Sequence, residues 1–249
     1  MLGLLLVPLR AICLGQRPLV ARLVPLTVTP AAIATLGEPA RDRCCSRGYA
    51  SCVTVGLQWP YVPPDGWTAA DLDRLSLDGP YGELDALKRI ELIDGDLIVM
   101  SPQTEFHRRV VERLRDELAR QAPDEWTATR EMDVVLGERQ RPCPDVSVVS
   151  AVAAKDLDRT SYVPADVVLV VEVVSKSSEI RDRETKPRRY AEAGIRHFWR
   201  VENDGGRPVA YVYELDPATH TYTLTGIFHE QLKLAVPFPV DLSLAALSV

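Results

Sequence analysis

The chain has 249 residues, of which 46% are hydrophobic and 26% charged, and its mean hydropathy is −0.05. These values are typical of one folded domain with or without a tail. The chain is long enough to bury a hydrophobic core without disulfides or structural metal ions. The net charge of −6 argues against nucleic-acid binding through overall charge, although a local basic patch would suffice. No apolar run approaches the roughly 20 residues of a membrane helix, so no membrane partner is expected.

The cysteines are unevenly distributed along the chain. Four of the five, Cys13, Cys44, Cys45 and Cys52, precede residue 55, and Cys143 lies in the part that is expected to fold. An odd number without regular spacing is not typical of a disulfide framework or a zinc site. A reducing compartment, the cytoplasm, is therefore the expected location.

Residues 1–55 differ in composition from the rest. They contain six arginines, no lysine and two acids, Glu38 and Asp42, and they show neither helical nor strand periodicity. A secretory signal is disfavoured because Met1–Leu9 carries no basic residue. A transit peptide fits the arginine-rich composition better, and a tail that does not fold, such as one translated from upstream of the natural start, fits it best. We expect a disordered or poorly ordered extension over 1–55 and a folded domain over 56–249.

The folded part is predicted to begin with a short helix and a β-hairpin. Thr68 can cap a helix over Ala69–Leu75, with Asp71 completing a pattern that resembles a capping box. Apolar and polar residues then alternate around Asp94 and Gly95. An Asp-Gly pair between such segments is the strongest short-range signal for a hairpin.

The next segments predict an amphipathic helix and three strands. Phe106–Gln121 repeats apolar residues at helical spacing and ends before Pro123. Strands are expected over Thr127–Leu136, Asp145–Ser150 and Asp166–Ser175. The last is a nearly continuous β-branched run, which is typical of a central strand buried on both faces.

The remaining elements complete the predicted fold class. A polar segment containing Pro187 leads into a helix over Arg188–Ala193, and strands are expected over His197–Val201, Pro208–Leu215 and Thr219–Ile227. This order of elements predicts one α/β domain with a mixed β-sheet flanked by helices.

Two acidic residues stand out because each lies in an apolar strand. Glu172 interrupts the run Val167–Val174, where an ionised carboxylate is costly unless a cation or several donors meet it. The alternative is a glutamate near the strand end that reaches solvent or pairs with an arginine. Asp145 opens another apolar strand directly after Pro144, although Pro-Asp also begins many ordinary turns and strands.

The two acids together predict a metal site. If their strands are neighbours, the carboxylates of Asp145 and Glu172 can lie side by side, where they would repel each other. A divalent cation would remove this conflict, and oxygen ligands with open positions suit Mg²⁺ or Mn²⁺. The main-chain carbonyl of Val173 could add a further ligand.

Several stretches of the sequence, taken in order, resemble the Uma2 (DUF820) family of restriction-endonuclease-like proteins. These stretches are Glu91–Leu97, Pro144–Val146, Val171–Ser175, Lys186–Ile195 and Phe198–Trp199, and the resemblance covers roughly residues 60 to 235. It implies the PD-(D/E)XK nuclease fold with a divalent metal at the acids. Asp145 then matches the aspartate of the PD element, and Glu172 matches the acid of the (D/E)XK element.

The sequence departs from the general motif at the lysine, because Val174 stands where that lysine is expected. The family pattern offers a lysine on the following helix instead, which here is Lys186. Such an ammonium group could orient or deprotonate a water molecule, or neutralise charge in the transition state. Lys176 is the rival, because it shares strand parity with Glu172. Either lysine could also be an ordinary solvated side chain.

Two further residues are accessory candidates. Glu91 lies in a strand before the long helix and could be a third acid on the metal. His107, at the start of that helix, could contact metal-bound water or a phosphate. A capping or solvent-exposed role is the alternative for each of them.

A segment near the proposed site is rich in basic residues, set against three acids. Its basic members are Lys176, Arg181, Arg183, Lys186, Arg188 and Arg189. A net positive segment of this kind suits a phosphodiester backbone, and the alternative is a solvated loop and helix face.

The function expected from these observations is a Mg²⁺-dependent endonuclease that hydrolyses phosphodiester bonds in DNA, with Asp145, Glu172 and Lys186 as its catalytic residues. A non-catalytic nucleic-acid-binding or regulatory domain on the same fold is the alternative. A homodimer, which would present one site to each strand of a duplex, is compatible with the nuclease hypothesis.

Overall fold

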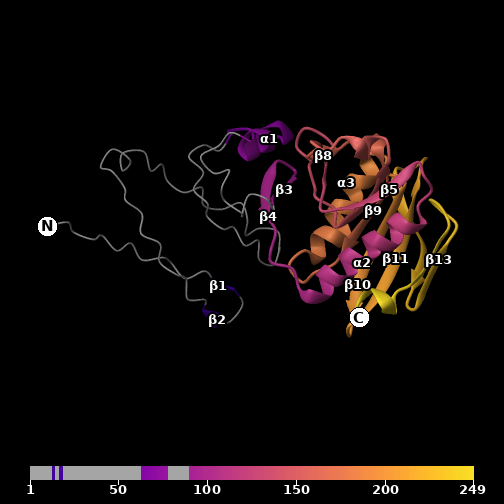
Figure 1. Cartoon of the computed structure of the whole chain (residues 1–249). Coiled ribbons are helices and arrows are strands. Elements are labelled where there is room, and N and C mark those ends of the chain that lie inside the picture. The colour runs from indigo at the N-terminus through magenta and orange to yellow at the C-terminus, as the bar shows by residue number, and fades with distance from the viewer. Residues whose placement is uncertain (1–12, 15–16, 19–62, 78–89) are drawn as a thin grey trace, which may run out of the picture. The chain divides into compact units, whose positions relative to one another are not determined.

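The computed structural model describes residues 13–14, 17–18, 63–77 and 90–249 (Figure 1). The chain divides into two units, Met1–Gln58 and Trp59–Val249. In the first unit, β1 (Cys13–Leu14) pairs antiparallel with β2 (Arg17–Pro18). The other residues of the expected 1–55 extension lie outside the described residues. Every element that follows belongs to the second unit.

Helix α1 (Ala69–Leu77) forms where the capping pattern predicts it. The backbone N–H of Thr68 donates to Asp71 Oδ2 at 2.9 Å, and the N–H of Asp71 donates to Thr68 Oγ1 at 3.3 Å. This reciprocal pair satisfies two amide groups that a helix N-terminus leaves without partners. Buried Arg141 donates to Ala69 O and to Asp73, which joins α1 to the body of the unit.

The Asp-Gly hairpin is also confirmed. Strand β3 (Ile90–Ile93) pairs antiparallel with β4 (Asp96–Val99). The φ angles of Asp94 and Gly95 are 55° and 85°, and a tight two-residue hairpin turn requires such positive values. Every residue of β3 is buried, because Leu92 exchanges backbone hydrogen bonds with Arg141 on its other side.

A six-stranded mixed sheet forms the centre of the unit, in the order β12-β11-β10-β9-β7-β5. Strands β9 and β10 are parallel, and the other neighbouring pairs are antiparallel. This confirms the predicted α/β fold with a mixed sheet. The strands are β5 (Trp126–Arg130), β7 (Val146–Ser150), β9 (Val167–Val173), β10 (His197–Asp204), β11 (Arg207–Asp216) and β12 (Thr221–Phe228).

The single strand expected over Thr127–Leu136 is wrong. The backbone of Glu131 takes a positive φ of 51°, which turns the chain out of the sheet after β5. Strand β6 (Asp133–Val134) then pairs in parallel with β8 (Ser161–Tyr162) in a separate two-stranded sheet.

The helix expected over Arg188–Ala193 begins earlier. Helix α3 spans Lys186–Glu192 and directly follows a π-helical turn over Arg181–Thr185. Pro187 lies in the first turn of α3, where its missing N–H costs no hydrogen bond. The continuous helical stretch therefore reaches back to Arg181, close to the end of β9.

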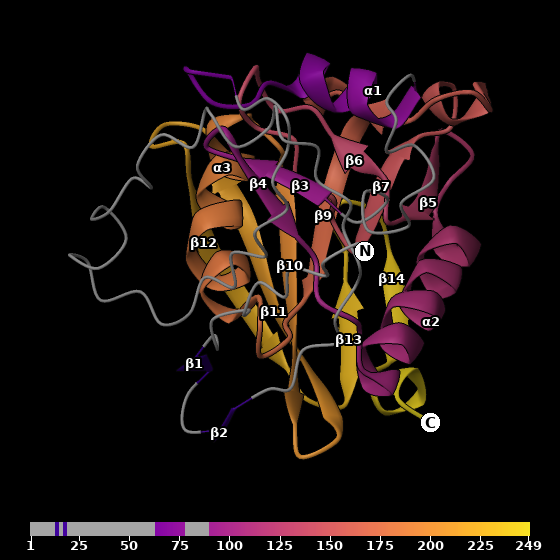
Figure 2. The ribbon, with the colours of Figure 1, turned by 90° about the vertical axis from the view of Figure 1, so that its left-hand side faces the viewer.

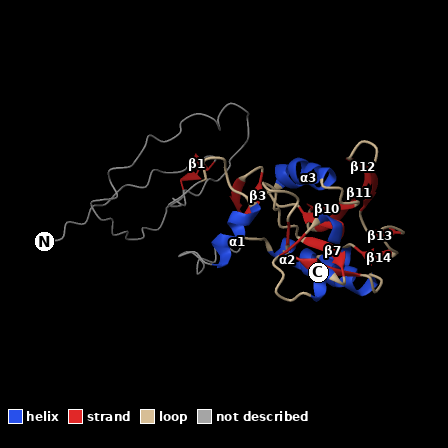
Figure 3. Ribbon diagram, turned by 90° about the horizontal axis from the view of Figure 1, so that it is seen from above, coloured by secondary structure: helices blue, strands red, loops and turns tan. Residues whose placement is uncertain are grey.

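Helices α2 and α3 cover opposite faces of the sheet (Figures 2 and 3). Helix α2 (Glu105–Gln121) packs Leu114 and Leu118 in one core cluster with Trp199 of β10. Helix α3 packs Tyr190 in a second cluster with Phe198, the residue before Trp199. Because neighbouring strand residues point to opposite faces, the two clusters are separated by the sheet.

The remaining described elements are short. The hairpin of β13 (Gln231–Leu234) and β14 (Val240–Ser243), which the sequence analysis did not predict, adds Leu232 and Leu242 to the core beneath α2. Short 3-10 turns lie at Ala153–Lys155, Pro164–Asp166 and Ala245–Leu247. Within the described part of the chain, no helix has both the length and the apolar character to cross a membrane.

Candidate active site

Asp145 and Glu172 lie side by side, as the sequence analysis predicted. In the antiparallel pair of β7 and β9, Val146 is opposite Val171, so the residues just beyond them, Asp145 and Glu172, are cross-strand neighbours. Asp145 Oδ2 accepts a hydrogen bond from the N–H of Val173 at 2.7 Å. Both carboxylates are buried, with residue exposures of 3% and 1%. They lie on the α3 face of the sheet, because Val170 has the same parity as Glu172 and packs with α3.

The ammonium group of Lys186 lies at the centre of the acidic cluster. Lys186 Nζ is 2.7 Å from Glu91 Oε1, 3.1 Å from Glu172 Oε2 and 3.5 Å from Asp182 Oδ1. All four side chains are at most 3% exposed. Three different elements, β3, β9 and the helical stretch after β9, thus bring their charged groups together away from solvent.

Lys176, the other candidate for the catalytic lysine, lies outside the acidic cluster. Strand β9 ends at Val173, so the strand parity that linked Lys176 to Glu172 stops before it reaches the lysine. Lys176 is exposed, whereas Lys186 is buried against the acids. Of the two candidate lysines, Lys186 is therefore the one that the fold brings to Asp145 and Glu172.

Asp182 is a site residue that the sequence analysis missed. It is one of the three acids in the segment that is rich in basic residues, where an acid is ordinarily exposed, yet it is only 2% exposed. The N–H of Lys186 bonds to Arg181 O in the wider π-helical turn, and Asp182 and Lys186 point into the same cluster. Their spacing of four residues was the available signal, because residues at that spacing share one side of a helix.

Glu172 does not take either of the ordinary roles considered for it. Its carboxylate accepts from Tyr190 Oη at 2.6 Å and from Lys186 Nζ at 3.1 Å. Arg200 is opposite Glu172 on β10, but its guanidinium pairs with Glu202 at 2.8 Å instead. Glu172 is therefore a buried acid with a lysine and a tyrosine as its partners.

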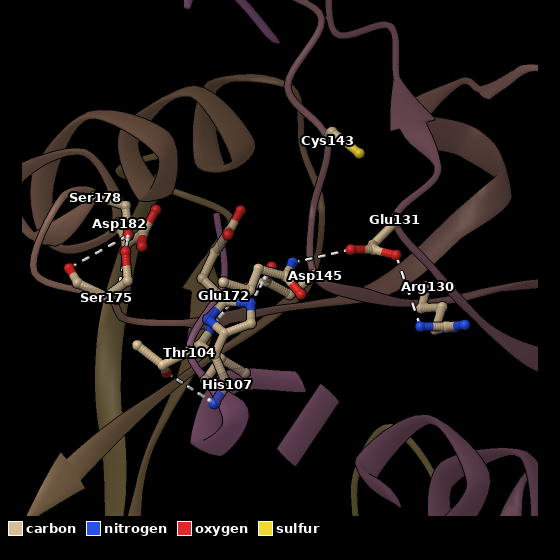
Figure 4. Close-up of polar contacts among 12 residues, drawn as sticks. Thr104, His107, Arg130, Glu131, Cys143, Asp145, Glu172, Ser175, Ser178 and Asp182 are labelled. Carbon is tan, nitrogen blue, oxygen red and sulfur yellow. Dashed lines mark hydrogen bonds and ion pairs between the residues drawn. The ribbon is translucent and has the colours of Figure 1, made fainter. Parts of the chain in front are cut away.

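His107 and Glu91 also reach the site. His107 Nε2 is 3.0 Å from Asp145 Oδ1, while its backbone N–H bonds to the N-cap residue Thr104 (Figure 4). The imidazole thus orients one carboxylate oxygen of Asp145, and the Val173 amide orients the other. Glu91 Oε1 accepts a hydrogen bond from the Cys143 N–H at 3.0 Å in addition to its contact with Lys186.

Burial shifts the pKa values of the clustered groups. It raises the pKa of Glu172 well above its usual value, against the opposing effect of Lys186. Burial likewise raises the pKa of Asp182 to about 6, again opposed by Lys186. Burial alone would lower the pKa of Lys186, but the carboxylates of Glu172, Glu91 and Asp182 outweigh it and hold that pKa well above its usual value.

The pKa of His107 is also raised. Burial of the ring acts to lower this pKa, and the hydrogen bond that the ring donates to Asp145 reverses that effect. The charges that result are one permanent cation, Lys186, and several acids that compete for it. The cluster therefore holds more carboxyl groups than its own cation can pair with closely.

The donor set matches a divalent cation in its chemistry. Carboxylate oxygens are the ligands that Mg²⁺ and Mn²⁺ prefer, and the buried Asp182 Oδ1 has no hydrogen-bond partner within the described residues. In the described part of the chain, however, no three His, Cys, Asp or Glu side chains are arranged as a metal-binding group. The position between Glu91 and Glu172 is held by Lys186 Nζ, so a cation would have to share these acids with the ammonium group.

A small cavity adjoins the cluster. Its volume is about 30 Å³, which is room for about two water-sized groups. Four of its lining residues, Glu91, His107, Asp182 and Lys186, belong to the site described above. The other lining residues are Met100, Ser101, Pro102, Gln103, Ser175, Ser177, Ser178 and Arg181. The charged groups can therefore be reached by a small part of a larger ligand.

The basic segment predicted to contact a phosphodiester backbone is mostly neutralised. Lys186 is buried in the cluster and is not part of a surface patch. Arg183 pairs with Glu179 and with Glu202, and Arg189 pairs with Asp94 and with Glu192. Arg188 lies 3.9 Å from Glu192. These arginines carry nearby counter-charges, which reduces the positive field that the segment presents.

The family model described as "Uma2: Putative restriction endonuclease" matches residues 74–247. Among solved structures, the chain is similar to one from Anabaena variabilis described as "a putative nuclease belonging to DUF820". The two share 18% sequence identity and a TM-score of 0.50, over 64% of this chain and 88% of the other. At this level of identity the structural likeness concerns the fold alone. No curated protein matches the sequence.

The family match spans most of the described domain and includes every acid of the buried cluster together with Lys186. The fold agrees with that of the similar solved structure. The family match supports a nuclease-type function for the domain. The chain belongs to the Uma2 family.

Proposed function

We propose that the protein is a metal-dependent endonuclease that hydrolyses phosphodiester bonds in DNA. The observation that supports this most directly is the buried cluster of Asp145, Glu172, Glu91 and Lys186. Two of its members, Glu91 and Lys186, line a cavity. Grouped carboxylates beside an ammonium group are suited to a reaction in which negative charge develops on phosphate oxygens. The Uma2 family match supports the same reaction class.

Asp145, Glu172, Glu91 and the main-chain carbonyl of Val173 would hold the cation. A bound Mg²⁺ or Mn²⁺ would supply an acidified water and offset charge on the phosphate. The side chains around these ligands hold them in place. His107 and the Val173 amide orient the two oxygens of Asp145, and Tyr190 orients Glu172.

Lys186 has the role of a fixed positive charge. Its pKa is held well above the usual value by Glu172, Glu91 and Asp182, which outweigh the opposing effect of burial, so the ammonium group keeps its proton at neutral pH. A protonated lysine cannot accept a proton from water. Lys186 therefore donates hydrogen bonds, to the acids in the free protein and to a phosphate oxygen when substrate is bound.

A non-catalytic DNA-binding domain is the second candidate, and one observation favours it. Lys186 already pairs with Glu91 and Glu172, so the cluster has a counter-charge of its own. A descendant that had lost catalysis could keep these residues for stability. The two candidates differ in whether DNA is cut.

A nicking assay on supercoiled plasmid distinguishes them. We expect cleavage with Mg²⁺ or Mn²⁺, none with EDTA, and a loss of at least about 100-fold in rate in Asp145→Asn. The matched control is Asp116→Asn on the exposed side of α2, which should cut within about twofold of the wild type. Binding of DNA without cleavage under either metal would favour the second candidate. An equal loss of cleavage rate in the two variants would show that Asp145 is not part of the active site.

A further inference from the structure

Arg181 differs from the other arginines around the site. It is the first residue of the π-helical turn, next to Asp182, and it lines the cavity with Glu91 and Lys186. Arg183, Arg188 and Arg189 each have a carboxylate partner. Among the described residues, no ion pair or hydrogen bond involves the guanidinium of Arg181, although several acids lie in the same cluster.

The unpaired state of Arg181 is costly in the free protein. Its Nε is buried and has no hydrogen-bond partner within the described residues. A buried donor without an acceptor loses its hydration and gains nothing in return. Glu91, Glu172 and Asp145 are engaged by Lys186, Tyr190 and His107. Asp182 Oδ1 has no hydrogen-bond partner within the described residues, so it does not supply the missing acceptor either. The group that fits such a donor is an anion brought by a ligand.

Hydroxyl groups line the same cavity. Ser175 Oγ lies 3.1 Å from Ser177 Oγ and 2.8 Å from Ser178 Oγ. Figure 4 shows Ser175 and Ser178 grouped with Asp182 on one side of Glu172. A serine hydroxyl can rotate about its C–O bond to donate to a new acceptor. The cavity therefore offers a guanidinium and rotatable hydroxyls beside the acidic cluster.

The size of the cavity limits what can enter. About 30 Å³ admits phosphate oxygens but is too small for a base or a sugar ring. A guanidinium is suited to phosphate because its N–H groups donate to two oxygens at once. A contact of this kind would not distinguish one base from another.

We propose that Arg181, with Ser177 and Ser178, binds the non-bridging oxygens of the phosphodiester that is presented to Lys186 and the acids. This inference rests on the proposed nuclease function, because it assigns the substrate subsite of the same site. Arg181 is then a substrate-binding residue, which fixes the phosphate without reading the sequence.

The test compares Arg181→Gln with Arg188→Gln, an exposed arginine of the same segment. Binding of a fluorescent DNA duplex is measured by anisotropy with Ca²⁺ over a range of salt, and plasmid cleavage is measured with Mg²⁺. We expect Arg181→Gln to weaken binding by roughly 10- to 100-fold. The slope of log affinity against log salt should fall by about one unit. Arg188→Gln should change binding less than about threefold.

A third variant tests geometry. Arg181→Lys keeps the positive charge but loses the planar guanidinium, which can donate to two oxygens at once. It should therefore show the salt slope of the wild type and only part of the wild-type cleavage rate. Melting temperatures of the variants should not fall below that of the wild type, because Arg181 makes no described contact that folding needs and its buried Nε lacks an acceptor.

The outcomes separate the two proposals. If the wild type cuts DNA and Arg181→Gln binds and cuts as Arg188→Gln does, the subsite is wrong and the nuclease function stands. If the wild type neither cuts nor binds DNA, both proposals fail.

Discussion

Lys186 takes the position among the acids that a metal ion would compete for. Its ammonium group contacts Glu91 and Glu172 and lies 3.5 Å from Asp182, with all four side chains buried. A buried carboxylate without a counter-charge is strongly destabilising. The lysine therefore has a structural role in the free protein as well as the role proposed for it in catalysis.

The structural role predicts the behaviour of Lys186→Met. Removing the cation leaves buried acids without their partner, and we expect a loss of roughly 3–5 kcal/mol in the free energy of unfolding at pH 7. Urea unfolding in EDTA measures it. The control Lys155→Met, at the end of a short surface turn, should change stability by less than about 0.5 kcal/mol. Similar values for the two variants would contradict the buried cluster.

The raised pKa of Asp182 predicts how the stability of the protein depends on pH. Burial raises its pKa to about 6, against an ordinary value of 3.8, so between these pH values the folded state binds more protons than the unfolded state. The stability that this group contributes is therefore present at low pH and declines as pH rises through about 4 to 6.

The decline should be on the order of 1–3 kcal/mol, and Asp182→Asn should lack that part of it. Urea unfolding at several pH values in EDTA measures the difference between the two proteins. The neighbouring exposed acid gives the control variant Glu184→Gln, which should keep the wild-type profile. An Asp182→Asn profile parallel to that of the wild type would show that Asp182 titrates normally.

At the scale of elements, a tight turn brings Glu91 to the site. The β3–β4 hairpin depends on positive φ angles at Asp94 and Gly95, and β3 is held by its backbone bonds with Arg141. A Cβ added at Gly95 would approach the Arg139 side chain at 2.3 Å. The end of an arginine side chain can move, so the main cost is backbone strain.

The prediction concerns Gly95→Ala and the control Gly205→Ala. Gly205, in the turn between β10 and β11, has φ of 59° and open space around its Cβ position. Both variants should lose about 1 kcal/mol of stability through strain at positive φ. Only Gly95→Ala should also slow plasmid cleavage, because the hairpin positions Glu91. Equal cleavage rates in the two variants would mean that Glu91 is not needed.

These elements also explain how far prediction from the sequence could go. Glu172 and Asp145 could be identified because an acid in an apolar strand is unusual, and the register of β7 and β9 confirms that they are neighbours. The hairpin and the capped helix α1 have local signals of their own. Asp182 had none of comparable strength, because an acid in a polar segment is ordinary and a π-helical turn has no simple sequence pattern.

Other features depended on tertiary structure. The break after β5 occurs at Glu131, a residue that rarely takes a positive φ, so the predicted strand continued past it. The basic segment was judged by its charge alone, and the partners of Arg183 and Arg189 come from distant strands and turns. The role of Lys176 was inferred from a strand that ends before that residue.

At the scale of the whole described domain, the sheet separates most of the core from the site. Leu114, Leu118 and Trp199 pack on the α2 face, whereas Glu172, Lys186 and Tyr190 lie on the α3 face. Truncations in the core on the α2 face should therefore affect mainly stability, whereas removal of the Tyr190 hydroxyl on the α3 face should affect mainly chemistry.

Leu118→Ala and Tyr190→Phe test this separation. Leu118 is fully buried, and its truncation should cost roughly 2–5 kcal/mol while the folded fraction keeps its cleavage rate. Tyr190→Phe removes the hydrogen bond to Glu172 and should lower kcat by about tenfold, with a small change in stability. Urea unfolding and cleavage kinetics measure the two effects, and a Leu118→Ala protein that is folded but inactive would contradict the separation.

A lysine among the acids has a consequence for how the protein matures. Because the chain carries its own counter-ion on α3, it can complete its fold during synthesis in the absence of any inorganic ion. Uptake of the proposed cation would then be a later event, governed by supply rather than by folding. A preparation from which a chelator has removed divalent cations should consequently remain cooperatively folded and able to bind a cation that is added later.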